Sequence, residues 1–102
     1  MMRKHVLIRI RQEFSTEKPT LWVGKNGITP DMTEQARKQL ESREVVKIRL
    51  QRSVPQAVEE IARLLAAETE SEVADVRGRS FLLYKPSGRE WKTGNMVDED
   101  KI

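Results

Sequence analysis

After Pro19, segments whose apolar residues recur at every second position alternate with segments whose apolar residues recur every three or four positions. The order of these segments limits the folds that this chain can adopt. In EVVKIRL, residues 44–50, Val46, Ile48 and Leu50 fall on every second position, which is typical of a strand. Elsewhere apolar residues recur three or four positions apart, which is typical of a helix on a core. The other predicted strands are residues 20–23, 72–76 and 80–85. The order predicts an α+β fold with a mixed sheet, β-α-β-α-β-β.

Both predicted helices begin at recognisable start signals. Thr29 can cap the first helix, with Pro30 in its first position. The inner stripe of this helix comprises Ile28, Met32, Ala36 and Leu40. The second helix is predicted to start at the capping-box pattern Ser53-Val54-Pro55-Gln56 and to end near Thr69. Two helices that follow strands in this order are expected to pack on one face of the sheet.

The N-terminal segment, residues 1–18, fits two patterns. Val6, Ile10 and Phe14 have helical spacing, but Val6, Ile8 and Ile10 would also alternate along a strand. We expect a helix of about two turns. The second face of the sheet would be covered only if this segment folds across it. The predicted domain is residues 19–89, and the polar tail, residues 90–102, is expected to be disordered.

Composition excludes several classes of function. The 102 residues fit one domain without cysteine and with a single histidine, His5, so disulfides, thiolate metal sites and a catalytic histidine pair are absent. We therefore predict no catalytic residue, no metal, no cofactor and no small-molecule substrate. No apolar stretch approaches the roughly 20 residues that span a bilayer, and a signal-peptide cleavage pattern is missing. The expectation is a soluble cytoplasmic protein without a membrane partner.

The net charge of +3 conceals a separation of charge along the chain. Residues 53–75 carry six acidic residues and one basic residue, whereas residues 1–28, 29–52 and 76–94 are each net positive. If the acidic segment folds onto one side, the opposite side presents a cationic surface that attracts phosphates. The alternative is that these charges only solvate the surface.

Two glycines, Gly24 and Gly27, interrupt the chain between the first predicted strand and the first predicted helix. Glycine permits positive φ and lacks the Cβ that would hold a ligand away. The helix start adds N–H groups, Lys25 adds a charge and Asn26 adds a donor, which together favour a sugar-phosphate backbone. An ordinary strand–helix turn is the alternative, because GxxG alone is a weak signal. The patterns of nucleotide-cofactor loops are absent.

Three segments, TLWVGKNGIT, EVVKIRL and VRGRSFLLYKPSGR, resemble the CRM domain family (chloroplast RNA splicing and ribosome maturation) in its stand-alone YhbY-like form. The resemblance covers residues 19–89. It implies a sandwich similar to the C-terminal domain of bacterial translation initiation factor 3. It also implies RNA binding, with stand-alone members linked to precursors of the large ribosomal subunit and plant organellar relatives linked to intron splicing. The family's RNA-contacting loop corresponds to Gly24, Lys25, Asn26 and Gly27.

The predicted RNA contacts outside this loop are cationic side chains near it or on exposed strand positions. Lys18 precedes the first strand and is expected beside the loop. Lys47 and Arg49 point away from the buried side of their strand. Arg77 and Arg79 flank the glycine of a tight hairpin signal. Trp22 and Tyr84 are expected to be core residues or half-buried packing residues rather than to stack on bases.

These features predict a non-catalytic protein that grips the backbone of structured RNA. Ribosomal precursor RNA and ribosomal particles are the expected partners, and tRNA or an intron is the alternative RNA. A different interpretation is a protein-interaction adaptor whose acidic second helix docks a basic partner. An enzyme acting on RNA is disfavoured, because the chain offers no obvious acid–base site.

Overall fold

The computed structural model describes residues 4–85, with side chains from Val6 onward. Its elements are α1 (Lys4–Phe14), β1 (Leu21–Val23), α2 (Pro30–Arg43), β2 (Val45–Leu50), α3 (Val58–Thr69), β3 (Glu72–Arg77) and β4 (Ser80–Tyr84). The predicted α+β class and the order of elements after Pro19 are confirmed. The tail predicted at residues 90–102 lies outside the described residues.

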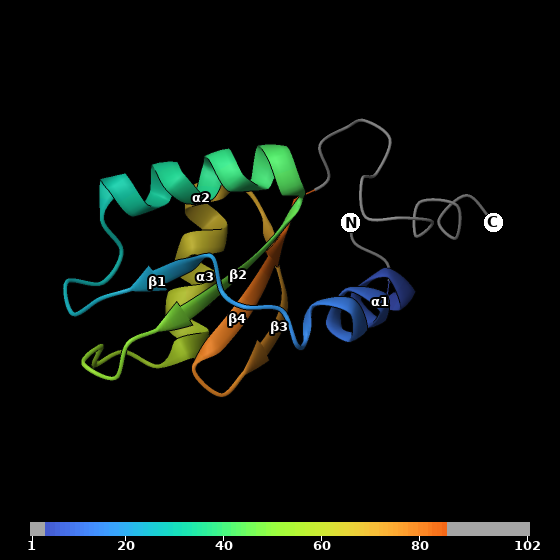
Figure 1. Ribbon diagram of the computed structural model, residues 1–102. Helices are drawn as coiled ribbons and strands as arrows, with labels where there is room; N and C mark the ends of the chain where they lie inside the picture. The colour runs from blue at the N-terminus through green and yellow to red at the C-terminus, as the bar shows by residue number, and fades with distance from the viewer. Residues whose placement is uncertain (1–3, 86–102) are drawn as a thin grey trace.

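The four strands form one mixed sheet in the order β1-β2-β4-β3 (Figure 1). β1 runs parallel to β2, whereas β2 and β3 each pair antiparallel with β4. The β3–β4 hairpin turns at Gly78 and Arg79, and Gly78 has a φ of +60°, as a tight hairpin turn with glycine first requires. Because β1 and β2 are parallel, both strands end at the same end of the sheet.

α2 and α3 cover one face of the sheet and enclose the larger core (Figure 1). Alternate residues of β2 point into this core, as the EVVKIRL pattern predicts. The inner stripe of α2 is confirmed at Met32, Ala36 and Leu40, which are buried, and Ile28 packs partly buried against the same core. Both predicted helices therefore pack on one face.

α1 packs on the opposite face of the sheet. Val6 and Ile10 are buried there against Ala74 and Tyr84 in a second, smaller core. The Arg11 Nε–H group donates to the Ala74 carbonyl oxygen at 3.0 Å and fixes the helix to β3. The predicted N-terminal helix is confirmed, and its 11 residues make about three turns rather than two.

The start of α3 differs from the prediction. The capping-box pattern places it at Ser53, but α3 begins at Val58, and its N-cap residue makes no side-chain hydrogen bond. Val54 is buried in the larger core, and its N–H group donates to the Gln51 carbonyl oxygen at 3.1 Å, so this stretch is a turn. Pro55 disfavours helical backbone at the residue before it. Burial of Val54 and the geometry of Pro55 together outweigh the capping pattern.

We expect Ile10→Ala to lower the free energy of unfolding by about 2–5 kcal/mol, because Ile10 is fully buried between α1 and the sheet. Ile8→Ala on the same helix is the matched control. Ile8 is 41% exposed, and we expect its truncation to cost less than about 1 kcal/mol. Urea unfolding followed by circular dichroism measures both values, and equal losses would contradict the packing of α1 on the sheet.

Candidate nucleic-acid interface

Residues 24–27 form a tight turn immediately after β1. The Gly27 N–H group donates to the Gly24 carbonyl oxygen at 2.9 Å, so Lys25 and Asn26 occupy the two central positions of the turn, where both are exposed. Gly27 has a φ of +72°, a left-handed conformation that other residues rarely adopt. A Cβ atom on Gly27 would meet nothing within 4 Å. The turn therefore projects its two polar residues into solvent and faces open space at Gly27.

The base of this turn is tied to the end of β2. The Gln51 N–H group donates to the Val23 carbonyl oxygen at 2.9 Å. A Cβ atom on Gly24 would lie 3.5 Å from the Gln51 Oε1 atom, an ordinary contact, and the φ of Gly24 is not left-handed. The two glycines thus differ, because only Gly27 holds a conformation that demands glycine.

The N-terminus of α2 follows the turn, and it offers fewer free N–H groups than the sequence argument assumes. Thr29 is the N-cap as predicted: its Oγ1 atom accepts from the Met32 N–H group at 3.2 Å. Pro30 has no N–H group, and Asp31 brings a negative charge into the first turn. Attraction of an anion to this turn therefore depends mainly on Lys25 rather than on the helix terminus.

Three segments that are far apart in the sequence gather at one end of the sheet, here called the loop end (Figure 1). The loop end comprises residues 24–27, 51–54 and 77–80. The Leu50 N–H group donates to the Arg79 carbonyl oxygen at 2.7 Å, and the Arg79 guanidinium donates to the carbonyl oxygens of Leu50 and Gln51. Arg79 therefore ties the hairpin to the end of β2. Arg52 is an exposed cation at this end that the sequence analysis did not select.

α1 covers only part of the second face of the sheet, and the remainder is here called the open face. Strand pairing aligns one row of side chains across it: Trp22, Arg49, Ser80 and Arg77. Trp22 is 53% exposed, since its neighbours Leu21 and Val23 point into the larger core on the other side. Arg49 is exposed, and its Nη1 atom donates to the Ser80 Oγ atom at 3.5 Å.

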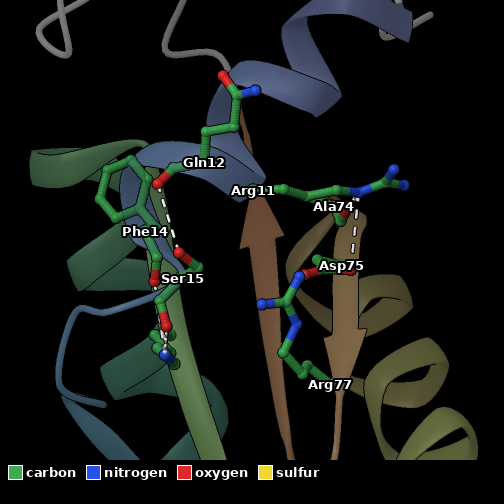
Figure 2. A network of polar contacts seen from close by, with 8 residues as sticks. Arg11, Gln12, Phe14, Ser15, Ala74, Asp75 and Arg77 are labelled. Carbon is green, nitrogen blue, oxygen red and sulfur yellow. Dashed lines mark hydrogen bonds and ion pairs between the residues drawn. The ribbon is translucent and has the colours of Figure 1, made fainter.

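A hollow of about 210 Å³ lies between this row and the end of α1. Its charged lining residues are Lys47, Arg49, Asp75 and Arg77, three cations and one carboxylate. Asp75 Oδ2 lies 3.8 Å from Arg77 Nη2, and Asp75 Oδ1 lies 3.6 Å from Arg11 Nε. Figure 2 shows the Arg77 side chain reaching toward Asp75 below the end of α1. One carboxylate does not balance these cations, so the hollow attracts anions.

Lys47 and Lys18 lie differently from the other predicted contacts. Lys47 is half-buried, and its Nζ atom donates to the carbonyl oxygens of Phe14 at 3.4 Å and Ser15 at 3.0 Å, which fixes the end of α1. Lys18 is exposed in the connection that enters β1, whereas the glycine turn leaves the other end of that strand. The expectation that Lys18 lies beside the turn is therefore wrong.

The two strand aromatics differ in burial. Trp22 is 53% exposed, at the outer limit of the half-buried packing that the sequence predicts, and belongs to neither core, whereas Tyr84 is buried as predicted. The alternation of Leu21, Trp22 and Val23 contains the signal, because a strand that buries its first and third residues turns the second to the opposite face.

Among residues 4–85, no three carboxylate, histidine or cysteine side chains come together as a metal site would require. None of the described helices is both long enough and apolar enough to cross a membrane.

The sequence, compared with models of known protein families, identifies the class to which this α+β domain belongs. The model of the CRS1/YhbY (CRM) domain matches residues 2–85, so the chain belongs to this family. The match begins within the N-terminal segment and includes α1, which the resemblance at residues 19–89 leaves out.

Two relatives extend this comparison. The chain is 29% identical over 69 residues to the protein named "Probable RNA-binding protein YqeI" of Bacillus subtilis, covering 68% of this chain and 72% of the relative. The solution structure of the hypothetical protein SAV1595 from Staphylococcus aureus, described as a candidate RNA-binding protein, has a TM-score of 0.75 and 27% identity. That likeness covers 88% of this chain and 94% of SAV1595.

We expect Gly27→Ala to lower the free energy of unfolding by about 1–2 kcal/mol, because an L-residue is strained at a φ of +72°. Gly24→Ala is the matched control, with an expected change within about 0.5 kcal/mol, since its Cβ would make an ordinary contact. Thermal and urea unfolding of both variants measure the difference. If Gly27→Ala were as stable as the wild type, the left-handed geometry of the turn would be refuted.

Proposed function

We propose that this protein binds RNA without catalysing a reaction, and that it holds the RNA backbone at the loop end. The observation that carries the proposal is the exposed turn at residues 24–27. Lys25 and Asn26 project from it, and open space adjoins Gly27. A turn without bulky side chains at its glycines lets a sugar-phosphate chain approach the peptide backbone closely, and phosphate contacts need no base sequence.

The surrounding charges support this placement. Lys25, Arg52 and Arg79 stand at the loop end, and Arg49 and Arg77 continue the cationic surface onto the open face. The guanidinium of Arg79 is partly engaged with backbone carbonyls, so Lys25 and Arg52 are the more available cations of this end. Surfaces of this kind bind phosphates with an affinity that falls as salt rises.

The family and the relatives agree with RNA as the ligand. The chain belongs to the CRM domain family, and both YqeI and SAV1595 carry descriptions as RNA-binding proteins. Within that class we favour precursor RNA of the large ribosomal subunit, bound free or in ribosomal particles, because the sequence resembles the stand-alone YhbY-like members. A tRNA or an intron is the alternative target.

The acidic outer face of α3 supports a second candidate function, docking of a basic protein. Glu59 and Glu60 are exposed in its first turn, and Leu64, which is 51% exposed, lies one turn further on. An affinity capture that retains the same protein partner after nuclease treatment would favour this adaptor role over RNA binding.

Charge reversal at the turn tests the RNA proposal. We expect Lys25→Glu to weaken binding of a fluorescently labelled single-stranded RNA at moderate salt and to reduce the magnitude of the log–log salt slope by about 0.7, the contribution of one phosphate contact. The wild-type slope should be about −0.7 per phosphate contacted. Fluorescence anisotropy at several salt concentrations gives both quantities.

Lys38→Glu is the matched control for this experiment. Lys38 is exposed on α2 away from the loop end, and its reversal changes the net charge by the same amount. An equal effect of the two substitutions would show that only net charge matters and would refute the role of the turn. Failure of the wild-type protein to bind any RNA would refute the proposed function itself.

A further inference from the structure

Trp22 is the largest exposed apolar side chain among the described residues, and it lies on the cationic surface formed by the loop end and the open face. It belongs to an edge strand, and only Val23 separates it from the glycine turn. Along the sheet its neighbour on β2 is Arg49, the direct partner of Trp22 in the parallel pair. An exposed tryptophan beside the Arg49 guanidinium is poorly suited to contact another hydrophobic surface, because the charged neighbour would have to be desolvated there.

The dimensions of the row favour a short strand of nucleic acid over a single small anion. Strands lie about 4.8 Å apart, so Arg49 is one spacing from Trp22, whereas Arg77 on the far edge strand is three spacings away, roughly 14 Å. Arg49 and Arg77 also line the hollow beside Ser80, together with Lys47 and one carboxylate, that of Asp75. A ligand that uses all of these positions must present a flat apolar group and negative charges at intervals. Unpaired RNA has this chemistry.

We propose that a short unpaired segment of RNA crosses the open face, with one base stacked on the Trp22 indole and with phosphates beside Arg49 and Arg77. This inference rests on the proposed RNA-binding function and adds a second contact to it. A duplex hides the faces of its bases, so stacking on Trp22 requires an unpaired base. The open face therefore selects single-stranded over double-stranded RNA, which backbone contacts at the loop end do not do.

The fluorescence of Trp22 tests the proposal directly, because stacking on a base quenches an indole. The chain has two tryptophans, so Trp91→Phe leaves Trp22 as the sole reporter. We expect a single-stranded RNA of about 10 nucleotides to quench this fluorescence on binding. Inorganic polyphosphate is the matched probe, with negative charges and no bases, and it should leave the fluorescence unchanged. A duplex of the same RNA should quench less than the single strand.

Two substitutions of Trp22 separate stacking from folding. Trp22→Phe keeps an aromatic face, whereas Trp22→Val keeps a residue suited to a strand and removes the face. We expect Trp22→Val to bind the single strand about 5- to 150-fold more weakly than the wild type, the range that corresponds to the loss of one stacked base. Trp22→Phe should retain most of the affinity. Thermal unfolding of both variants verifies that the exposed position tolerates the change.

The outcomes separate this inference from the proposed function. If labelled RNA binds while Trp22 fluorescence stays constant, or if the valine and phenylalanine variants bind alike, stacking is refuted and RNA binding stands. Quenching by polyphosphate equal to that by RNA would also refute stacking. If the wild-type protein binds no RNA, both proposals fall together.

Discussion

The length and anchoring of α1 are the constraint on which the second face of the sheet depends. Its 11 residues extend about 16 Å, so the helix covers a band of the sheet and not its whole surface. Lys47 fixes the end of that band by donating to the carbonyl oxygens of Phe14, the last residue of α1, and of Ser15 after it, where the negative end of the helix dipole attracts an ammonium group. Beyond Lys47 the strands carry polar residues and Trp22. The side chain that holds α1 thus also sets the boundary of the open face.

Parallel pairing of β1 and β2 has a comparable effect at the loop end. A strand, a helix and a parallel strand return the chain to the same end of the sheet, so the turn after β1 and the segment after β2 become neighbours. β3 runs in the same direction as β2 because both pair antiparallel with β4, and the hairpin therefore arrives there too. Cations at positions 25, 52 and 79 are brought together by topology alone.

Much of this arrangement could be predicted from periodicity, because burial alternates from Val46 to Leu50 in β2 and recurs with helical spacing in α2. The start of α3 could not be predicted, because a capping pattern depends only on neighbouring residues, whereas the backbone at Val54 is set by burial of its side chain in the core. The predicted position of Lys18 was wrong for a related reason. Lys18 is close in sequence to β1 and to the glycine turn, but it lies at the start of the strand and the turn lies at its end. For Lys47, alternation correctly gave the face, but its bonds to α1 depend on where a distant helix ends. No sequence pattern near Arg52 marks it as an RNA contact. It becomes a candidate only because the fold brings the three loops of the loop end together.

The two surfaces would make different use of one RNA strand. Contacts to phosphates at the loop end weaken with salt and are blind to the bases. Stacking on Trp22 depends on an exposed base and is less sensitive to salt. Because only Val23 separates Trp22 from Gly24, a strand held at the turn would keep its next nucleotides at a high effective concentration near the indole. Neither contact alone needs to be strong. Their combination would favour places where a structured RNA gives way to an unpaired segment. Only there can the loop end bind the backbone of the structured part while Trp22 stacks on an unpaired base.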